Sequence, residues 1–190
     1  MDIPQVIVKP VYVPTTLPVF VCSLSAFKPQ LALAREGLDE LRLSHPESTE
    51  SNVRASYMSP WRSHLLNPKF AHLCDSVVTI AKFASANYLT SSYDALNMDL
   101  VVQDCWGAIY TQADHTELHN HFPADFGCVV YLEADKDCAP IVFANNFSVQ
   151  PEADMLLLFP GLLDHAVPTT AARRVVISMN LYKRAMFARA

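Results

Sequence analysis

The sequence lacks any apolar run long enough to span a membrane and has no leader-like start. A membrane-spanning helix needs ~20 consecutive apolar residues, and no window of the 190-residue chain approaches that length. Residues 1–21 are apolar, but they contain four prolines, no basic start and no small-residue cleavage site. Because a signal peptide requires these features, we expect neither a signal peptide nor association with a membrane.

Clusters of basic side chains are also missing, and the formal net charge is −5. A protein that grips a phosphate backbone needs a basic patch, so nucleic acid is not an expected partner. Charged residues make up only 17% of the chain and apolar residues 51%, a composition that excludes a disordered protein. We expect one folded domain over residues 1–190.

Cysteine pairs of the CxxC type are absent, and the cysteine count of five is odd. This pattern argues against a disulfide framework and against a zinc–thiolate cluster, and it fits a reducing cytoplasm best. Cys74 and Cys128 stand in apolar surroundings and are expected to be small core residues.

The character of the sequence changes near Asp99. Residues 1–98 are expected to form N-terminal strands and supporting helices, with amphipathic helices over residues 31–43 and 68–89. The second helix has apolar residues at three- and four-residue steps, namely Phe70, Leu73, Val77, Ile80 and Ala84, and should pack on a sheet. The segment 44–67 between them predicts an ordered loop that either covers the site or is pinned to the core by its aromatics, Tyr57 and Trp61.

Residues 99–190 consist of short runs rich in Val, Ile, Phe and Tyr, separated by Pro, Asn, Asp and Gly. This spacing is typical of a β-sandwich or barrel, and the absence of intervening helical patterns excludes a parallel α/β sheet. The chain is therefore predicted to be mainly β with flanking helices.

Three histidines in this half form a candidate metal site. His119 and His121 are two residues apart, so in an extended strand they point to the same face. His165 follows an apolar strand that can hold it opposite this pair. Three neutral nitrogen ligands leave other coordination positions open for a substrate and oxygen.

Other titratable residues are weaker candidates for this site. Asp125 is an alternative to His121 as a ligand, although the three residues between them include a proline and make a shared face poor. His115 is expected in a loop, and the remaining histidines, His45, His64 and His72, are expected to be structural residues outside the barrel.

The last predicted strand carries a candidate anion-binding residue. Alternation places Arg174 on one face with Val176, Ser178 and Asn180, and Arg173 on the other. We expect this strand to form a hairpin with the strand of His165, which brings Arg174 close to the histidines. Its planar guanidinium suits a two-pronged pair with a carboxylate. The alternative is that Arg174 is exposed and Arg173 faces inward.

From Cys105 to Lys183 the chain resembles the 2-oxoglutarate- and Fe(II)-dependent oxygenase superfamily, and more narrowly the oxygenases common in marine bacteria and their phages. The resemblance rests on Trp106, HNHFP, GCVVYL, PEADMLLLFPGLLDHAVPTT and RVVISMN, and upstream on ESNVRASYMSPWRS. Cys128 stands where that family prefers glycine, and the loop before Ile141 lacks the family's glycine.

The resemblance implies a double-stranded β-helix, or jelly-roll, similar to that of cupins, in which His119 and His165 bind iron. His121 stands where the wider superfamily has a carboxylate ligand. It also implies that Arg174 binds the distal carboxylate of 2-oxoglutarate. The other predicted cofactor-binding residues are Tyr110, Tyr131, Ser178 and Asn180, although a core role for either tyrosine is the more common case.

The activity implied is oxidation by 2-oxoglutarate and O2, with hydroxylation of a peptidyl or small-molecule substrate as the expected outcome. Two alternatives stay open at this point. One is a cupin-like dioxygenase with a three-histidine iron and no 2-oxoglutarate, and the other is a non-catalytic jelly-roll module that binds a ligand or partner. The oligomeric state is equally open, and a homodimer is one option.

Overall fold

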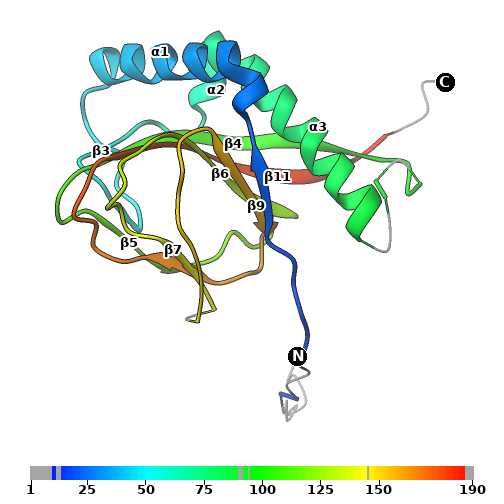
Figure 1. Ribbon diagram of the computed structural model, residues 1–190. Coiled ribbons are helices and arrows are strands. Elements are labelled where there is room, and N and C mark those ends of the chain that lie inside the picture. The colour runs from blue at the N-terminus through cyan, green and yellow to red at the C-terminus, as the bar shows by residue number, and fades with distance from the viewer. Residues whose placement is uncertain (1–9, 12–13, 90–91, 94, 145, 187–190) are drawn as a thin grey trace, which may run out of the picture.

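The computed structural model describes residues 10–11, 14–89, 92–93, 95–144 and 146–186, and it shows two antiparallel sheets that face each other, with helices over one of them (Figure 1). The six-stranded sheet has the order β1 (Phe20–Ser23), β9 (Met155–Pro160), β6 (Phe126–Ala134), β11 (Arg174–Ala185), β4 (Met98–Tyr110) and β3 (Tyr57–Met58). The five-stranded sheet has the order β2 (Val53–Arg54), β5 (His115–His119), β10 (His165–Val167), β7 (Ile141–Phe143) and β8 (Phe147–Val149). The predicted mainly-β jelly-roll is confirmed.

Two long helices, α1 (Lys28–Ser44) and α3 (Ala71–Tyr88), lie across the outer face of the six-stranded sheet (Figure 1). Helix α1 contains the predicted segment 31–43, and α3 covers most of the predicted segment 68–89, whose first three residues form a 3-10 turn instead. The shorter helices are α2 (Ser63–Leu66) and two 3-10 turns, Ser25–Phe27 and Pro68–Phe70. The approach of α1 to the sheet is close, because a side chain at Gly107 of β4 would lie 2.4 Å from Leu38 Cδ1.

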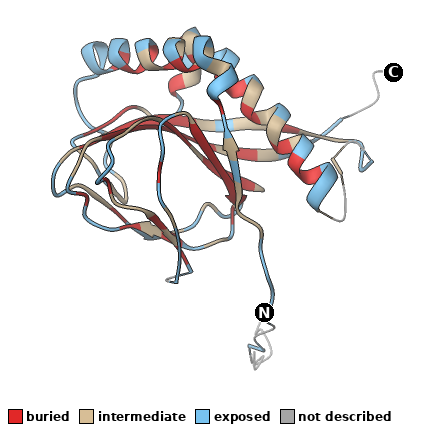
Figure 2. Cartoon of the chain, in the orientation of Figure 1, coloured by how far each residue is buried: buried red, intermediate tan, exposed pale blue. Residues whose placement is uncertain are grey.

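The six-stranded sheet is buried on both faces, whereas the five-stranded sheet is covered only on its inner face (Figure 2). One core cluster lies between the six-stranded sheet and the helices and includes Leu38, Phe70 and Ile177. A second lies between the two sheets and includes Tyr131 and Phe159. Double burial explains why β9 reads as a continuous apolar run instead of an alternating one.

The segment 44–67 is more structured than the predicted loop. It contains β2, β3 and α2, which are each two to four residues long. Tyr57 is buried at 2% exposure, and its hydroxyl donates to the carbonyl of His45 at 3.0 Å. Trp61 is 39% exposed and lines a groove at the barrel mouth. Tyr57 thus pins the segment to the core, as one of the two interpretations expected, whereas Trp61 is partly exposed.

The predicted hairpin between the strands of His165 and Arg174 is wrong. Strand β10 pairs with β5 and β7 in the smaller sheet, whereas β11 pairs with β4 and β6 in the larger one. Each strand already has a neighbour on both edges, so neither has an edge free for the other. Residues 168–173 cross from one sheet to the other, and His165 and Arg174 line the same cavity from opposite sheets.

Within the described part of the chain, no helix has both the length and the apolar character that crossing a membrane would require.

Candidate functional site

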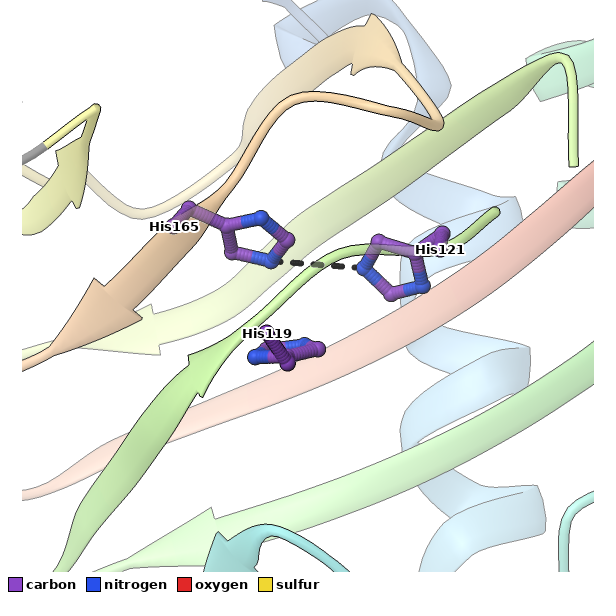
Figure 3. A group of neighbouring side chains, drawn as sticks. All are labelled: His119, His121 and His165. Carbon is purple, nitrogen blue, oxygen red and sulfur yellow. Dashed lines mark hydrogen bonds between the residues drawn. The ribbon is translucent and has the colours of Figure 1, made fainter. Parts of the chain in front are cut away.

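Three histidines converge at one end of the smaller sheet (Figure 3). His119 ends β5, His165 begins β10, and the two are register partners across these strands. His121 lies in the loop that follows β5. The candidate ligand nitrogens of the three residues all lie within 4.8 Å of one another, and the Nε2 atoms of His121 and His165 are 3.3 Å apart.

Backbone carbonyls determine the tautomers of two of these rings. Nδ1 of His119 is 2.8 Å from the carbonyl oxygen of Glu117, and Nδ1 of His165 is 3.0 Å from that of Leu163. A carbonyl oxygen can only accept, so each Nδ1 carries the proton and each Nε2 presents its lone pair to the centre of the group.

The three rings are also held neutral. Burial, together with repulsion from the neighbouring histidines, lowers the pKa of His165 to about 4 and that of His121 to about 3. Burial lowers the pKa of His119 as well. Neutral nitrogens with converging lone pairs repel one another unless a cation lies between them, so this donor set fits a divalent transition metal.

The ring of His121 occupies space that is free because Gly127 has no side chain. A Cβ at Gly127 would lie 2.6 Å from Cδ2 of His121 and 2.7 Å from Cε2 of Phe159. The sequence interpretation missed this residue, although a glycine inside a strand is the usual sign of a close approach. Cys128, which stands where the oxygenases that the sequence resembles prefer glycine, is buried in the core on the opposite side of the strand, as expected for a small core residue.

Arg174 is the inward residue of the pair at the start of β11, with only 1% exposure. Its Nη1 donates to the carbonyl of Ala139 at 3.1 Å, and its Cζ lies 4.0 Å from the centre of the Tyr110 ring. Nε has no hydrogen-bond partner, and among the described residues no carboxylate lies within ion-pair distance. Arg173 points away and donates to Glu133 at 3.0 Å.

A buried cation without an anion is costly, so this site favours an anionic ligand. The guanidinium and the three histidines line one cavity between the sheets. Its walls also include Trp106, Tyr110, Tyr131, Val176 and Ser178. Burial raises the pKa of both tyrosines, so they are neutral hydrogen-bonding groups at pH 7.

A second hollow is also lined by His119 and His121 and is termed the outer groove. Its remaining lining residues are Asn52, Val53, Trp61, Trp106, Asn120, Phe122, Asn180 and Tyr182. Trp61 and Trp106 pack edge to face with centroids 4.8 Å apart, and Phe122 is 76% exposed. Asn180, predicted to share the cavity of Arg174, lines this groove instead.

The other candidates lie apart from the histidine group. The carboxylate of Asp125 accepts from the backbone N–H of Lys183 at 2.8 Å and pairs with its Nζ, and it is not a member of the group. His115 is in β5, not in a loop, and it is register partner to Arg54. His45, His64 and His72 lie on or beside the helices, outside the barrel as predicted.

Searches of protein-family models and of curated proteins found no match to this chain. Solved structures do match. A prolyl-4-hydroxylase from Pseudomonas putida aligns over 90% of this chain and 94% of its own, with 14% identity and a TM-score of 0.59. HygX from Streptomyces hygroscopicus, with nickel, 2-oxoglutarate and hygromycin B bound, aligns over 88% and 83%, with 12% identity and a TM-score of 0.61.

The non-heme alpha-ketoglutarate-dependent epimerase SnoN from nogalamycin biosynthesis aligns over 88% of this chain and 77% of its own, with 11% identity and a TM-score of 0.65. At such low identity these likenesses establish the fold that the chain shares with 2-oxoglutarate oxygenases. What the chain binds has to be argued from its own residues.

Proposed function

We propose that this protein is an Fe(II)- and 2-oxoglutarate-dependent oxygenase. The observation that carries the proposal is the buried, anion-free guanidinium of Arg174 in the same cavity as three converging neutral histidines. One cavity thus offers a metal-binding end and a carboxylate-binding end. A keto acid with a second carboxylate has a chelating group for the first and an anion for the second.

In this proposal His119, His121 and His165 hold the iron, and Arg174 pairs with the distal carboxylate of 2-oxoglutarate. Together with O2, the bound iron and cosubstrate supply the oxidising power that converts a substrate C–H to C–OH, with succinate and carbon dioxide as by-products. Tyr110 stacks on the guanidinium and limits its freedom.

The remaining walls would position the cosubstrate and exclude water. Tyr131 and Ser178 offer neutral hydrogen-bonding groups inside the cavity, and Val176 adds an apolar surface. In such a dry site a charge pair is stronger than in water, which favours a defined orientation of the dicarboxylate.

The substrate would enter from the outer groove, which is lined by His119 and His121 but not by Arg174. Apart from these histidines, its lining consists of aromatic, aliphatic and amide side chains without charge. We propose hydroxylation of a peptidyl or small-molecule substrate in the cytoplasm, in keeping with two structural neighbours, a prolyl-4-hydroxylase and HygX with hygromycin B bound. A homodimer is compatible with this assignment.

A second candidate is a dioxygenase that uses the three-histidine iron without 2-oxoglutarate. It is favoured by one observation, the lack of a carboxylate in the ligand group. The buried Arg174 argues against it, because such an enzyme has no dicarboxylate to pair with this cation.

The deciding experiment is an anaerobic titration of the protein with Fe(II) and then 2-oxoglutarate, followed by visible absorption. A chelate of the two gives a metal-to-ligand charge-transfer band, which we expect at one equivalent of each. A His119→Ala variant serves as control and should show no band. Iron binding without the band would favour the second candidate, and no iron binding would leave a non-catalytic jelly-roll module.

A further inference from the structure

Three neighbouring strands contribute one residue each to a row below His121. Asn180 of β11 is the register partner of Gly127 on β6 and of Asp104 on β4. Residues directly opposite one another on adjacent strands lie on the same face and interact. Gly127 leaves the space that the His121 ring occupies, so the neighbouring Asn180 lies beside that ring.

The orientation of the Asn180 amide follows from Asp104. Nδ2 of Asn180 donates to Oδ2 of Asp104 at 3.1 Å. Because an ionised carboxylate can only accept, the NH2 end must face Asp104 and the oxygen must face the other way. That oxygen is buried and has no hydrogen-bond partner among the described residues. The Asn180 side chain also opposes the lowering of the His121 pKa, as an acceptor for the ring N–H would.

The nitrogen of His121 that needs an acceptor points away from the metal site. Its Nε2 faces His165, and Figure 3 shows the second ring nitrogen turned away from the other two histidines. The Nδ1 atoms of His119 and His165 each have a backbone carbonyl. Among the described residues no backbone carbonyl is hydrogen-bonded to the ring of His121, and the buried amide oxygen of Asn180 is likewise without a partner.

We propose that Asn180, oriented by Asp104, is a positioning residue that accepts the Nδ1–H of His121 and so turns the Nε2 lone pair toward the metal. This inference rests on the proposed metal site. It assigns Asn180 a task different from cosubstrate binding. It also gives Asp104 a role, because this carboxylate brings a negative charge close to a site with three neutral ligands. The nearest cation, Arg62 Nε, is 3.9 Å from Asp104, too far for a hydrogen bond.

The test is an anaerobic titration of metal-free protein with Co(II), whose visible d–d absorption reports both affinity and coordination geometry. Partners of this kind are worth roughly 10- to 100-fold in metal affinity. We expect Asn180→Ala and Asp104→Asn to weaken Co(II) binding by about that factor and to alter the spectrum. The matched control is Asp99→Asn on the same strand, where the carboxylate pairs with Lys82 and Arg184; its titration should equal that of the parent.

Two further variants separate positioning from a merely structural role. In the double variant Asp104→Asn with Asn180→Asp, the carboxylate accepts from both the new amide and His121, so the affinity lost in Asp104→Asn should return. In a His121→Ala background, where the two remaining histidines bind Co(II) only weakly and the titration is carried to high Co(II) concentration, Asn180→Ala should cause no further loss, because it acts through His121. Asp104→Asn keeps the side-chain volume and remains informative where Asn180→Ala does not fold.

Equal Co(II) affinity in the parent, Asn180→Ala and Asp104→Asn would overturn this inference while leaving the metal site intact. Additive losses in the His121→Ala background would overturn it as well. A parent protein that does not bind Co(II) would instead refute the proposed function.

Discussion

The two sheets of the barrel have different structural tasks. The larger sheet is covered by helices on one face and by the second sheet on the other, and it carries Arg174. The smaller sheet has strands of two to five residues with an outer face open to solvent, and it carries His119 and His165. Apolar burial that stabilises the fold is thus concentrated in one sheet and the candidate metal ligands in the other. Stability and metal binding should therefore be separable by mutation.

The sharpest separation is expected for the metal ligands on the smaller sheet. His119→Ala and His165→Ala should each abolish stoichiometric Fe(II) binding, because two remaining nitrogens hold the ion weakly, while the fold persists on the larger sheet. Metal analysis after anaerobic reconstitution and desalting measures the first effect, and circular dichroism the second. His72→Ala, on the exposed face of α3, is the control. Full iron occupancy in either ligand variant would show that the ligands are wrongly assigned.

The next largest effect is expected on 2-oxoglutarate affinity, to which the larger sheet contributes Arg174. Arg174→Met should weaken 2-oxoglutarate binding by roughly thirty-fold to several thousand-fold, because loss of a buried charge pair costs about 2–5 kcal/mol. Fe(II) affinity should not change. Isothermal titration under anaerobic conditions measures both. Arg173→Met is the matched control and should bind 2-oxoglutarate normally, since its side chain pairs with Glu133. Equal affinity in the two variants would contradict the role of Arg174.

A core substitution on the helix side should show the opposite pattern. Leu38 is fully buried between α1 and Gly107, so Leu38→Ala should lower the free energy of unfolding by about 2–5 kcal/mol. Leu43 lies on the same helix with 85% exposure, and Leu43→Ala should change stability by less than ~0.5 kcal/mol. Urea unfolding of the metal-free protein measures both. A large loss of Fe(II) affinity in folded Leu38→Ala would contradict the proposal that stability and metal binding depend on different sheets.

The smallest effect is a pH dependence from the histidine group. An unfolded histidine has a pKa of ~6.5, whereas burial holds His165 at about 4 and His121 at about 3. The unfolded chain therefore binds protons more tightly, and stability that is complete above pH 6.5 is lost as the pH falls toward these folded values. Between pH 7 and pH 5.5 we expect a loss on the order of 1–3 kcal/mol from this group in the metal-free protein.

Urea unfolding at several pH values measures this slope, and His165→Ala should flatten it while His72→Ala should not. An unchanged slope in His165→Ala would mean that other groups determine the acid sensitivity.

Local patterns in the sequence were sufficient for the elements and their faces. Three- and four-residue steps predicted α1 and α3, and alternation placed Arg174 and Arg173 on opposite faces of β11. Sheet membership was not predictable, because the partner of a strand is chosen by distant segments, and so the assumed β10–β11 hairpin failed. The two-residue strands β2 and β3 are too short to have a period.

The candidate site was predictable to a similar depth. The spacing of His119 and His121 within a strand-like segment indicated convergence, and the structure brings His165 to them. The task of Gly127 depends on how closely a loop residue packs on a neighbouring strand, which leaves only a weak local signal. The position of Asn180 depends on register partners contributed by β6 and β4, which no local pattern specifies.

The crossing between the sheets, residues 168–173, is anchored by hydrogen bonds of the buried Thr170. The backbone of Thr170 exchanges hydrogen bonds with residues 113 and 114, and its hydroxyl accepts from Ala139 and donates to Ala172. This short, hydrogen-bonded crossing connects the strand of His165 to the strand of Arg174, so it fixes the distance between the metal end and the anion end of the cavity. If the proposed function holds, the backbone of this crossing determines the length of the dicarboxylate that fits. A residue inserted into the crossing would change the distance between His165 and Arg174 without replacing either residue.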